Sequence, residues 1–365
     1  MLSRRQFQGL DRVFLTTTLL LLGIGLLSLY SAAFQKTQMT GVLYLERQLL
    51  WAGLGCALAL LLVVVDYHLW LEWSYLLYAL MLVMLGLVLV MGTVRGGAQR
   101  WLSIGGITLQ PSEFAKLTTI LAVARYLGHR PPVTGRWWTV LGASVLIGLP
   151  MALILKQPNL GTASVFGFAG LAMLLVWGIP LRPLLVVLGL GVLSMPVLWA
   201  FLEDYQRSRL LVFMNPNLDP LGAGYTVIQS RIAMGSGQLW GKGWLSGTQN
   251  QLNFLPERHT DFIFSVVGEE WGILGTSLCL ALFLLLFQRG FMIAQQTRDP
   301  FGRLLIVGLI TLLAAHTIVN MGMVLGLMPV VGLPLPFMSY GGSWMMTCLV
   351  AVGIVLSVGV RRPVF

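Results

Sequence analysis

The sequence predicts an all-α membrane protein that crosses the bilayer about ten times. Of its 365 residues, 57% are hydrophobic and only 10% are charged, and its mean hydropathy is +0.83. A soluble globular chain is nearer half apolar and about a quarter charged. Many of the apolar residues also fall in runs close to the ~20 residues that a helix needs to cross the hydrocarbon core. These observations exclude a soluble enzyme, a secreted disulfide scaffold and a disordered chain.

Ten apolar runs predict the spans. They cover residues 13–33, 49–65, 75–92, 112–127, 137–155, 162–178, 184–202, 262–287, 304–325 and 343–360. The fourth and sixth runs are short and have polar flanks, so we expect them to tilt little or to enter the bilayer only part-way. The first run lacks a small-residue cleavage site before a polar region, so no cleavable signal peptide is predicted.

The basic residues predict that both ends of the chain are cytoplasmic, because Lys and Arg concentrate on that side. With the N-terminus inside, the inner segments carry Arg4, Arg5, Arg12, Arg125, Arg130, Arg136, Arg182, Arg289, Arg298, Arg303, Arg361 and Arg362. The short outer loops carry only Lys36, Arg47, Arg95, Arg100 and Lys156.

The long loop Glu203–Asp261, between the seventh and eighth spans, then lies on the extracytoplasmic side. Interleaved apolar and aromatic residues indicate that this loop is structured. Within it, residues 223–234 are expected to form a short amphipathic helix at the membrane surface. No second domain is predicted, so residues 1–365 form a single transmembrane domain.

The cysteines and the charges give no sign of a metal centre or a nucleic-acid partner. Cys56, Cys279 and Cys348 lie far apart inside apolar runs, where cysteine behaves as a small hydrophobic side chain. No His, Cys or carboxylate residues have the spacing of a dedicated metal site. The net charge of +10 belongs to a membrane protein, in which the positions of the charges matter more than their sum.

Two ionisable residues stand inside the fourth predicted span. Glu113 and Lys116 are three residues apart near its outer end, so they share one face of the helix. One interpretation is an ion pair that neutralises itself in lipid. Because ionisable residues within spans usually mark a site or a pathway, we expect instead that both line a cavity.

A second polar cluster lies at the mouth of the eighth predicted span, in Leu255-Pro-Glu-Arg-His-Thr-Asp-Phe262. On one helix Glu269 would lie about 80° around from Asp261, whereas Glu270 would lie about opposite. We therefore expect Asp261 and Glu269 to face one cavity. The alternative is that Asp261 caps the helix N-terminus, where a carboxylate is favoured.

Three further motifs lie outside these clusters. His316 and Asn320, four residues apart in the ninth span, predict an interhelical hydrogen bond. The proline-rich segment 329–342 is expected to be a stiff outer loop that re-enters the bilayer. The glycine pattern of residues 235–241 misses the dinucleotide-binding spacing by one residue and follows no strand, so a nucleotide site is rejected.

Together these residues predict an outer cavity with one carboxylate and many cations. Such cations would attract an anionic lipid headgroup, and a diphosphate best matches Arg and Lys. A carboxylate beside a bound sugar can take the proton of an attacking hydroxyl. Glycosyl transfer from a lipid-linked diphosphate sugar fits this arrangement, and translocation of such a lipid fits it almost as well.

Several long motifs, in order over almost the whole chain, resemble the SEDS (shape, elongation, division and sporulation) family. They are Gly97-Ala-Gln-Arg-Trp101, Gln110-Pro-Ser-Glu-Phe-Ala-Lys116, Asp219-Pro-Leu-Gly-Ala-Gly-Tyr225, Gln229-Ser-Arg-Ile-Ala-Met-Gly-Ser-Gly237, Phe254-Leu-Pro-Glu-Arg-His-Thr-Asp-Phe-Ile-Phe264, Pro329-Val-Val-Gly-Leu-Pro-Leu-Pro336 and Ser339-Tyr-Gly-Gly342. Residues 241–249 and Arg258 look like the RodA branch of that family, which serves cell elongation.

The resemblance implies a multi-pass peptidoglycan glycosyltransferase of the bacterial inner (cytoplasmic) membrane. It implies that lipid II is the substrate and that a class B penicillin-binding protein, a transpeptidase, is the partner. The family's essential aspartate matches Asp261, and its buried Glu and Lys match Glu113 and Lys116. Asn159 departs from the pattern, because relatives often carry Asp there, and this puts a metal-binding or proton-transfer role at that position in doubt.

The roles expected from this reasoning are specific. Asp261 is the expected catalytic base of an inverting β-1,4 transfer. The expected substrate-binding residues are Arg207, Arg209, Lys242, Arg258, Glu113, Lys116, His259, Glu257 and Arg100. No metal ligand is assigned, although a divalent cation such as Mg²⁺ or Mn²⁺ could assist the departing diphosphate. A lipid II flippase and a non-catalytic scaffold for the transpeptidase stay open as alternatives.

Overall fold

The computed structural model describes residues 9–34, 40–95, 98–104, 107–130, 137–179, 181–202 and 204–361. Several residues used above lie outside these ranges. They are Arg4, Arg5, Lys36, Arg136, Arg362 and Glu203 of the charge pattern, and Gly97 of the first motif.

Long helices of the described part occupy all ten predicted runs. They are α2 (Arg12–Ala33), α3 (Thr40–Val64), α4 (His68–Met91), α5 (Pro111–Gly128), α6 (Trp137–Lys156), α7 (Leu160–Trp177), α8 (Leu181–Phe201), α12 (Ile263–Gln296), α13 (Pro300–Leu325) and α14 (Gly342–Arg361). Eight of these, all but α5 and α8, are long and apolar enough to cross a membrane by length and composition. The chain is therefore a polytopic membrane protein.

Some helices are buried at the centre of the bundle, and others surround them and expose apolar side chains. Most side chains of α5, α13 and α14 are buried. α14 packs against α3, α13 packs against α5 and α7, and α12 packs against α2. The outer helices instead expose large apolar residues, such as Val90 of α4 and Leu193 of α8. This pattern suits a lipid surrounding, in which exposed Leu and Val carry no penalty.

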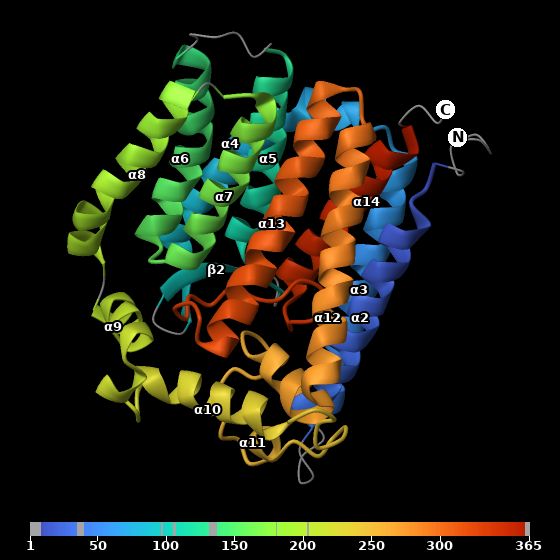
Figure 1. Cartoon of the computed structure of the whole chain (residues 1–365). Helices are drawn as coiled ribbons and strands as arrows, with labels where there is room; N and C mark the ends of the chain where they lie inside the picture. The colour runs from blue at the N-terminus through green and yellow to red at the C-terminus, as the bar shows by residue number, and fades with distance from the viewer. Residues whose placement is uncertain are drawn as a thin grey trace.

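The short elements gather at one end of the bundle. α2 begins and α14 ends at the upper end in Figure 1, whereas α9 (Asp204–Met214), α10 (Ala223–Ser236) and α11 (Thr248–Gln251) cross the lower end. We call the lower end the loop end and the upper end the terminal end. The helix predicted over residues 223–234 is confirmed as α10, which packs against α12 and α13.

A small antiparallel sheet between α4 and α5 was not predicted from the sequence. Its strands β1 (Thr93–Arg95), β2 (Ala98–Ile104) and β3 (Ile107–Leu109) are ordered β1-β2-β3. Thr93 pairs with Trp101, and Leu102 pairs with Leu109. The two Gly-Gly pairs between the strands, at 96–97 and 105–106, are a hairpin signal that could have indicated this sheet.

α12 is broken at Gly272, whose φ of 65° and ψ of −157° are not helical. The glycine-rich segment 237–243 fills the break. The N–H groups of Lys242 and Gly243 donate to the carbonyls of Glu269 and Glu270, at 3.0 Å each. In the other direction, the N–H groups of Ile273 and Leu274 donate to Gln238 and Leu239. The break thus keeps its backbone groups bonded within the protein, as a membrane segment requires.

This insertion accounts for the glycine pattern that resembled a nucleotide motif. Gly241 has a φ of +77°, and a Cβ atom there would lie 2.1 Å from the carbonyl oxygen of Glu270. A Cβ atom on Gly237 would lie 1.9 Å from the carbonyl oxygen of Gly268. The glycines of this segment therefore allow close backbone contact with α12.

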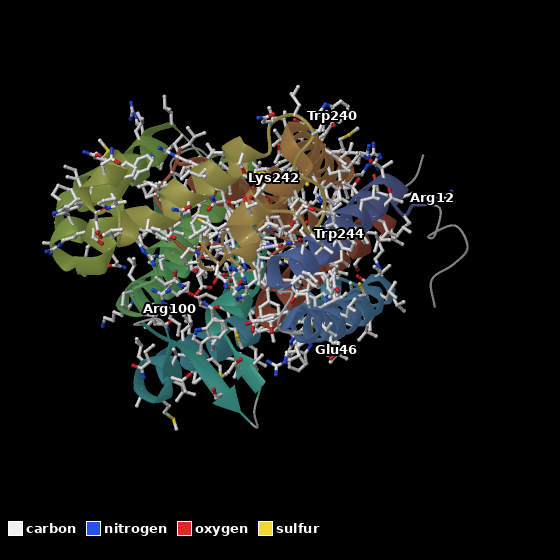
Figure 2. The ribbon with its side chains drawn as sticks, turned by 90° about the horizontal axis from the view of Figure 1, so that it is seen from below. Arg12, Glu46, Arg100, Trp240, Lys242 and Trp244 are labelled. Carbon is white, nitrogen blue, oxygen red and sulfur yellow. The ribbon has the colours of Figure 1, made fainter. Side chains whose placement is uncertain are left out.

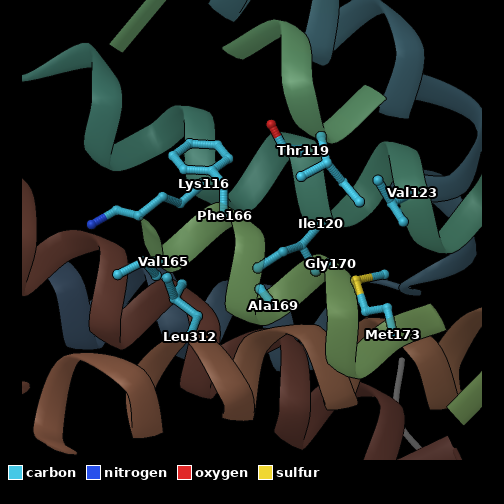
Figure 3. Close-up of a pocket in the computed structure, with 11 residues that line it drawn as sticks. Lys116, Thr119, Ile120, Val123, Val165, Phe166, Ala169, Gly170, Met173 and Leu312 are labelled. Carbon is cyan, nitrogen blue, oxygen red and sulfur yellow. The ribbon is translucent and has the colours of Figure 1, made fainter. Parts of the chain in front are cut away.

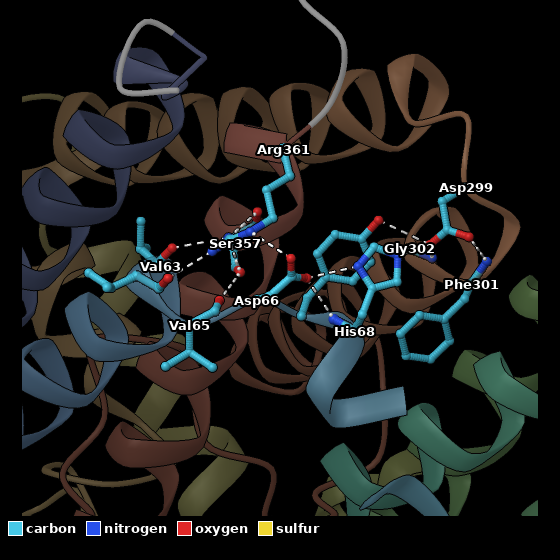
Figure 4. Close-up of polar contacts among 11 residues, drawn as sticks. Val63, Val65, Asp66, His68, Asp299, Phe301, Gly302, Ser357 and Arg361 are labelled. Carbon is cyan, nitrogen blue, oxygen red and sulfur yellow. Dashed lines mark hydrogen bonds and ion pairs between the residues drawn. The ribbon is translucent and has the colours of Figure 1, made fainter. Parts of the chain in front are cut away.

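A polar network at the terminal end joins the ends of three helices (Figure 4). Arg361 of α14 donates to the carbonyls of Val63 and Val64 at the end of α3, and its Nε lies 3.5 Å from Asp66 Oδ2. Asp299 caps the start of α13 and accepts from the Tyr67 hydroxyl at 3.1 Å. The network satisfies carbonyls left unpaired at the end of a helix.

Replacement of Gly241 by Ala should destabilise the fold. The new Cβ must move the carbonyl of Glu270 and occupy a strained backbone conformation, so we expect a loss of about 1–3 kcal/mol in the free energy of unfolding. Gly235→Ala is the matched control, because nothing lies within 4 Å of its Cβ position. Thermal unfolding in detergent measures both variants, and equal stability of the two would contradict this role of the break.

Candidate functional site

A polar cavity of about 550 Å³ opens at the loop end. Its walls come from α3, strands β2 and β3, the beginnings of α5, α7 and α14, and the segments 257–261 and 332–342. Five of the residues expected in the site line it: Asp261, Glu113, Arg100, Glu257 and His259. The structure therefore brings Asp261 and Glu113 into one cavity, whereas Lys116, which was expected to line a cavity with Glu113, does not line this one.

The backbone on both sides of Asp261 is fixed by hydrogen bonds from two other segments. Ser339 Oγ donates to the carbonyl of Thr260 at 2.6 Å. Asn320 Nδ2 donates to the carbonyl of Asp261 at 2.8 Å and to that of Leu333 at 2.7 Å. The N–H of Tyr340 donates to the carbonyl of His259 at 2.9 Å. The position of Asp261 thus depends on α13 and on the loop between α13 and α14.

Asp261 does not cap α12. The N-cap residue is Phe262, and no side chain caps this helix end. Among the described residues, no hydrogen bond reaches the carboxylate of Asp261, which remains partly exposed to the cavity. The capping interpretation is therefore wrong, and the carboxylate is available to a ligand.

The loop between α13 and α14 folds back into the bundle, in agreement with the expected re-entrant segment. Leu333, Leu335 and Phe337 are buried. The backbone of Met338 approaches the middle of α2 so closely that a Cβ on Gly25 would lie 2.6 Å from its Cα. Irregular backbone at such depth is tolerated where the protein buries it and satisfies its polar groups.

A buried polar cluster closes the floor of the cavity. Lys116 Nζ donates to Glu113 Oε2 at 2.7 Å and lies 3.0 Å from His316 Nε2. Since His316 Nδ1 lies 3.2 Å from the carbonyl of Pro334, we assign the proton to Nδ1, so that Nε2 accepts from Lys116. The His316 ring stacks on Trp344 at 4.0 Å, and the Lys116 ammonium lies 4.4 Å from the Trp344 ring centroid.

The predicted interhelical bond is confirmed for His316, which links α13 to α5 through Lys116. Asn320 instead binds loop carbonyls. The Lys116 side chain also borders a narrow apolar pocket between α5, α6, α7 and α13 (Figure 3), where its ammonium points away from Val123 and Met173. An alkyl stem in apolar surroundings with a paired charge at its tip is the usual arrangement for a buried lysine.

Burial and neighbouring charges set the protonation of Asp261. Burial is the largest effect and Glu257 adds to it, so the pKa of this carboxyl rises to about 6. The positive charges of Arg209 and Arg100 act in the opposite direction and favour the carboxylate. A carboxyl group with a pKa near 6 is suited to accept a proton at neutral pH.

Arg100 and Arg47 line the cavity, and Arg209 lies in an adjoining side pocket. Arg100 lines both the cavity and a small side pocket that it shares with Arg209 and Asn159. The Arg100 Nε donates to the carbonyl of Gln157 at 3.0 Å, which holds the guanidinium beside the start of α7. Arg47 of α3 also lines the cavity, and sequence reasoning missed it because it treated this residue only as an outer-loop charge.

Five of the expected substrate-binding cations do not line the cavity: Arg209, Lys116, Arg207, Arg258 and Lys242. Arg207 donates to the carbonyls of Trp199 and Ala200 at the end of α8. Arg258 Nε donates to the carbonyl of Ala32 at 2.6 Å. Lys242 pairs with Glu269 at 2.8 Å, and viewed from the loop end it lies far from Arg100 (Figure 2).

Glu269 also lies away from the cavity. Its carboxylate accepts from the N–H groups of Gln249 and Asn250 at the start of α11, as well as from Lys242. The expectation that Asp261 and Glu269 face one cavity is therefore wrong. It assumed a single continuous helix, whereas Asp261 precedes α12 and Glu269 lies next to the segment that fills the break at Gly272.

Tyr44 and Trp51 of α3, which the sequence did not single out, also line the cavity. Tyr340 of the α13–α14 loop and His259 line it with them, and the rings of Tyr44, Tyr340 and His259 form the aromatic wall of the cavity. Aromatic side chains are too frequent in membrane helices for their positions alone to indicate a site.

The described residues hold no group of three or more His, Cys, Asp or Glu residues that could bind a metal ion. Among the described residues, Glu257 is the acidic residue whose charge raises the pKa of Asp261. Two carboxylates are an incomplete ligand set for Mg²⁺ or Mn²⁺, which prefer several oxygen ligands in near-octahedral geometry.

A family model described as "Cell cycle protein", for FtsW, RodA and SpoVE, matches residues 11–363. The chain belongs to this family. It is 41% identical over 355 residues to peptidoglycan glycosyltransferase MrdB of Escherichia coli K12, and the match covers 96% of this chain and 95% of MrdB. These matches agree with the SEDS resemblance.

Two solved structures share the fold of this FtsW/RodA/SpoVE protein. One belongs to a peptidoglycan synthase complex that coordinates polymerization and crosslinking, with a TM-score of 0.81 and 34% identity over 97% of this chain and 98% of that one. The other is the rod shape determining protein RodA of Thermus thermophilus, with a TM-score of 0.73 and 34% identity over 97% of each chain.

Lys116→Met should destabilise the protein by about 3–5 kcal/mol, because it leaves the buried Glu113 without its partner. The double variant Glu113→Gln, Lys116→Met removes both charges and should lose less than the sum of the single changes. Equilibrium unfolding in detergent micelles measures this coupling. Strictly additive losses would show that the two charges are independent.

Proposed function

We propose that this protein is a peptidoglycan glycosyltransferase that polymerises lipid II into glycan strands during cell elongation. The observation that carries the proposal is the carboxylate of Asp261, which is partly exposed in a cavity that arginines and aromatic rings also line. Family membership over residues 11–363 and the 41% identity to MrdB support the same conclusion.

The expected reaction is a single displacement with inversion. The 4-hydroxyl of the acceptor's GlcNAc attacks the anomeric carbon of the donor's MurNAc, and Asp261 takes the hydroxyl proton. The new β-1,4 bond forms as the bond from the anomeric carbon to the diphosphate oxygen breaks, and the diphosphate leaves with the electron pair. One base is sufficient for inversion, unlike the two carboxylate roles of a retaining enzyme.

Arg100, Arg209 and Arg47 are the cations that we assign to the diphosphate. Arg100 and Arg209 lie close enough to lower the pKa of Asp261, so a diphosphate bound there would leave from beside the base. Guanidinium groups bind phosphate oxygens through paired hydrogen bonds and stabilise charge that develops on a leaving group. Arg207, Arg258 and Lys242 are assigned to structural roles instead, since their bonds lie outside the cavity.

Glu113, Lys116 and His316 are assigned to the floor of the site. Glu113 lines the cavity, while Lys116 is 1% exposed. A fixed, paired charge at the floor shapes the site without adding a free cation that would compete with Arg100. Glu257 and His259 are assigned to the rim, where both contact the cavity.

A divalent cation is assigned no step in this mechanism. Asp261 and Glu257 do not complete a ligand set, so Mg²⁺ or Mn²⁺ would depend on oxygen atoms of the bound diphosphate and of water for most of its ligands. Such an ion would supply positive charge to the leaving group.

We further propose ten spans, both termini in the cytoplasm, and location in the bacterial inner membrane. The cavity, α9, α10 and α11 then face the periplasm, where cell wall is made. We propose a class B penicillin-binding protein as the partner. Support comes from the solved synthase complex, whose matching chain has a TM-score of 0.81 to this protein.

Asp261→Asn should lower polymerisation by about 10²–10⁴-fold, because the amide cannot take the proton. The carboxylate accepts no hydrogen bond from a described residue, so the fold should be retained. Gel analysis of glycan strands made from fluorescent lipid II measures the rate, with the partner present. A variant that polymerises at the wild-type rate would exclude Asp261 as the base.

The pH profile should report the same carboxyl group. Because the base must be unprotonated and its pKa is raised to about 6, kcat/KM should rise with pH up to about 6 and then level off. Arg100→Gln removes a charge that favours the carboxylate, so the rising limb should move to higher pH. Glu257→Gln should move it to lower pH, because Glu257 raises this pKa. Shifts of the limb in the same direction for both variants would contradict the assignment.

A further inference from the structure

The aromatic wall of the cavity is a compact cluster of three rings. Tyr44 and His259 lie 5.0 Å apart between ring centroids, Tyr44 and Tyr340 lie 5.0 Å apart at an interplanar angle of 77°, and His259 and Tyr340 lie 6.0 Å apart. All three are partly exposed, and all three line the cavity that contains Asp261. Part of each ring therefore remains open to a ligand.

The backbone holds this cluster in place and leaves its polar edges available. Gln48, which is buried, donates to the carbonyl of Ser339 at 3.1 Å and accepts from the N–H of Gly341 at 3.2 Å. It thereby fixes α3 to the residues on both sides of Tyr340. No hydrogen bond in the described part of the chain engages the imidazole of His259 or the hydroxyl of Tyr340.

The cationic and aromatic residues around Asp261 differ in chemistry. Arg100 of β2 lines the cavity and Arg209 of α9 lines the adjoining side pocket, whereas the aromatic wall comes from α3 and the two loops that hold Asp261. Anions are recognised by guanidinium groups. Rigid aromatic side chains with a polar edge suit ligands that have both apolar faces and hydroxyl groups, as a pyranose ring has.

We propose that Tyr44, His259 and Tyr340 form the saccharide subsite of the acceptor, with the donor diphosphate at Arg100 and Arg209. The proposal rests on the proposed function and assigns its two substrates to different residues around Asp261. His259 is two residues from Asp261, and its carbonyl is bonded to the N–H of Tyr340. A sugar stacked on this wall would thus have its hydroxyl groups next to the base.

Competition with two partial ligands tests this arrangement. The soluble disaccharide pentapeptide carries the sugars without a diphosphate, and undecaprenyl diphosphate carries the diphosphate without sugars. Each is titrated as an inhibitor of lipid II polymerisation by the full chain with its partner. Tyr44→Leu and Tyr340→Ala should weaken inhibition by the disaccharide about tenfold, with inhibition by undecaprenyl diphosphate unchanged. Arg209→Gln should show the opposite pattern.

Conservative variants separate a binding role from a folding role. Tyr44→Trp and Tyr340→Phe keep a ring and should retain most of the inhibition by the disaccharide. Tyr75→Ala is the matched control, because Tyr75 lies beside Arg125 near the beginning of α4 and does not line the cavity. Unchanged inhibition by the disaccharide in Tyr44→Leu and Tyr340→Ala would overturn the proposal, and so would an equal weakening of both inhibitors.

Failure of the proposed function would be seen separately, as wild-type protein that makes no glycan strands. The subsite would still be tested in that event, because Trp51, Trp101 and Trp344 line the same cavity. Their fluorescence should change as the disaccharide pentapeptide is added to wild-type protein, and the midpoint should move to higher concentration in Tyr44→Leu. No such change in wild-type protein would overturn the subsite.

Discussion

The position of Asp261 depends on hydrogen bonds to the backbone around it and not on bonds to its carboxylate. Asn320 and Ser339 hold the carbonyls of Asp261 and Thr260. There is a chemical reason for bonding the backbone and leaving the carboxylate unbonded. A carboxylate that accepted hydrogen bonds from the protein would be a weaker base, because those bonds stabilise the charged form. Fixing the chain through carbonyl groups orients the side chain and leaves its oxygens to the substrate.

The same requirement, that polar backbone within a membrane protein be satisfied by the protein, accounts for the remaining irregular parts of the fold. The break in α12 accepts the glycine-rich segment 237–243, whose N–H and carbonyl groups bond to those that the break leaves unpaired. The loop between α13 and α14 is bonded by His316 and Asn320. Irregular backbone therefore occurs where a second segment is available to complete its hydrogen bonds.

The sequence was sufficient for the class of fold, the ten helical runs and the cavity that joins Asp261 to Glu113. Long apolar runs are typical of membrane-spanning helices, and charges inside such runs are tolerated mainly where they face the interior of the bundle.

The sequence was not sufficient to predict contacts between distant loops. Glu269 was placed by assuming one continuous helix, and nothing in its local pattern reveals that residues 237–243 enter at Gly272. Arg258 and Lys242 carry the positive charge that a diphosphate site needs, but their side chains bond to the carbonyl of Ala32 and to Glu269 instead. Arg47 and the ring cluster depend on α3 meeting a loop nearly 300 residues later, which periodicity cannot show.

The burial of α13 and α14 at the centre of the bundle has a consequence for biosynthesis. These helices are made last, yet they carry His316 and Trp344, which complete the surroundings of Lys116. Until they insert between the earlier helices, an ammonium group in α5 lacks two of its neighbours, and such a group is costly in hydrocarbon. In a chain cut short before residue 300, the ammonium group would keep Glu113 of its own helix as a partner but lack His316 and Trp344. The surroundings of Lys116 are therefore complete only in the finished chain.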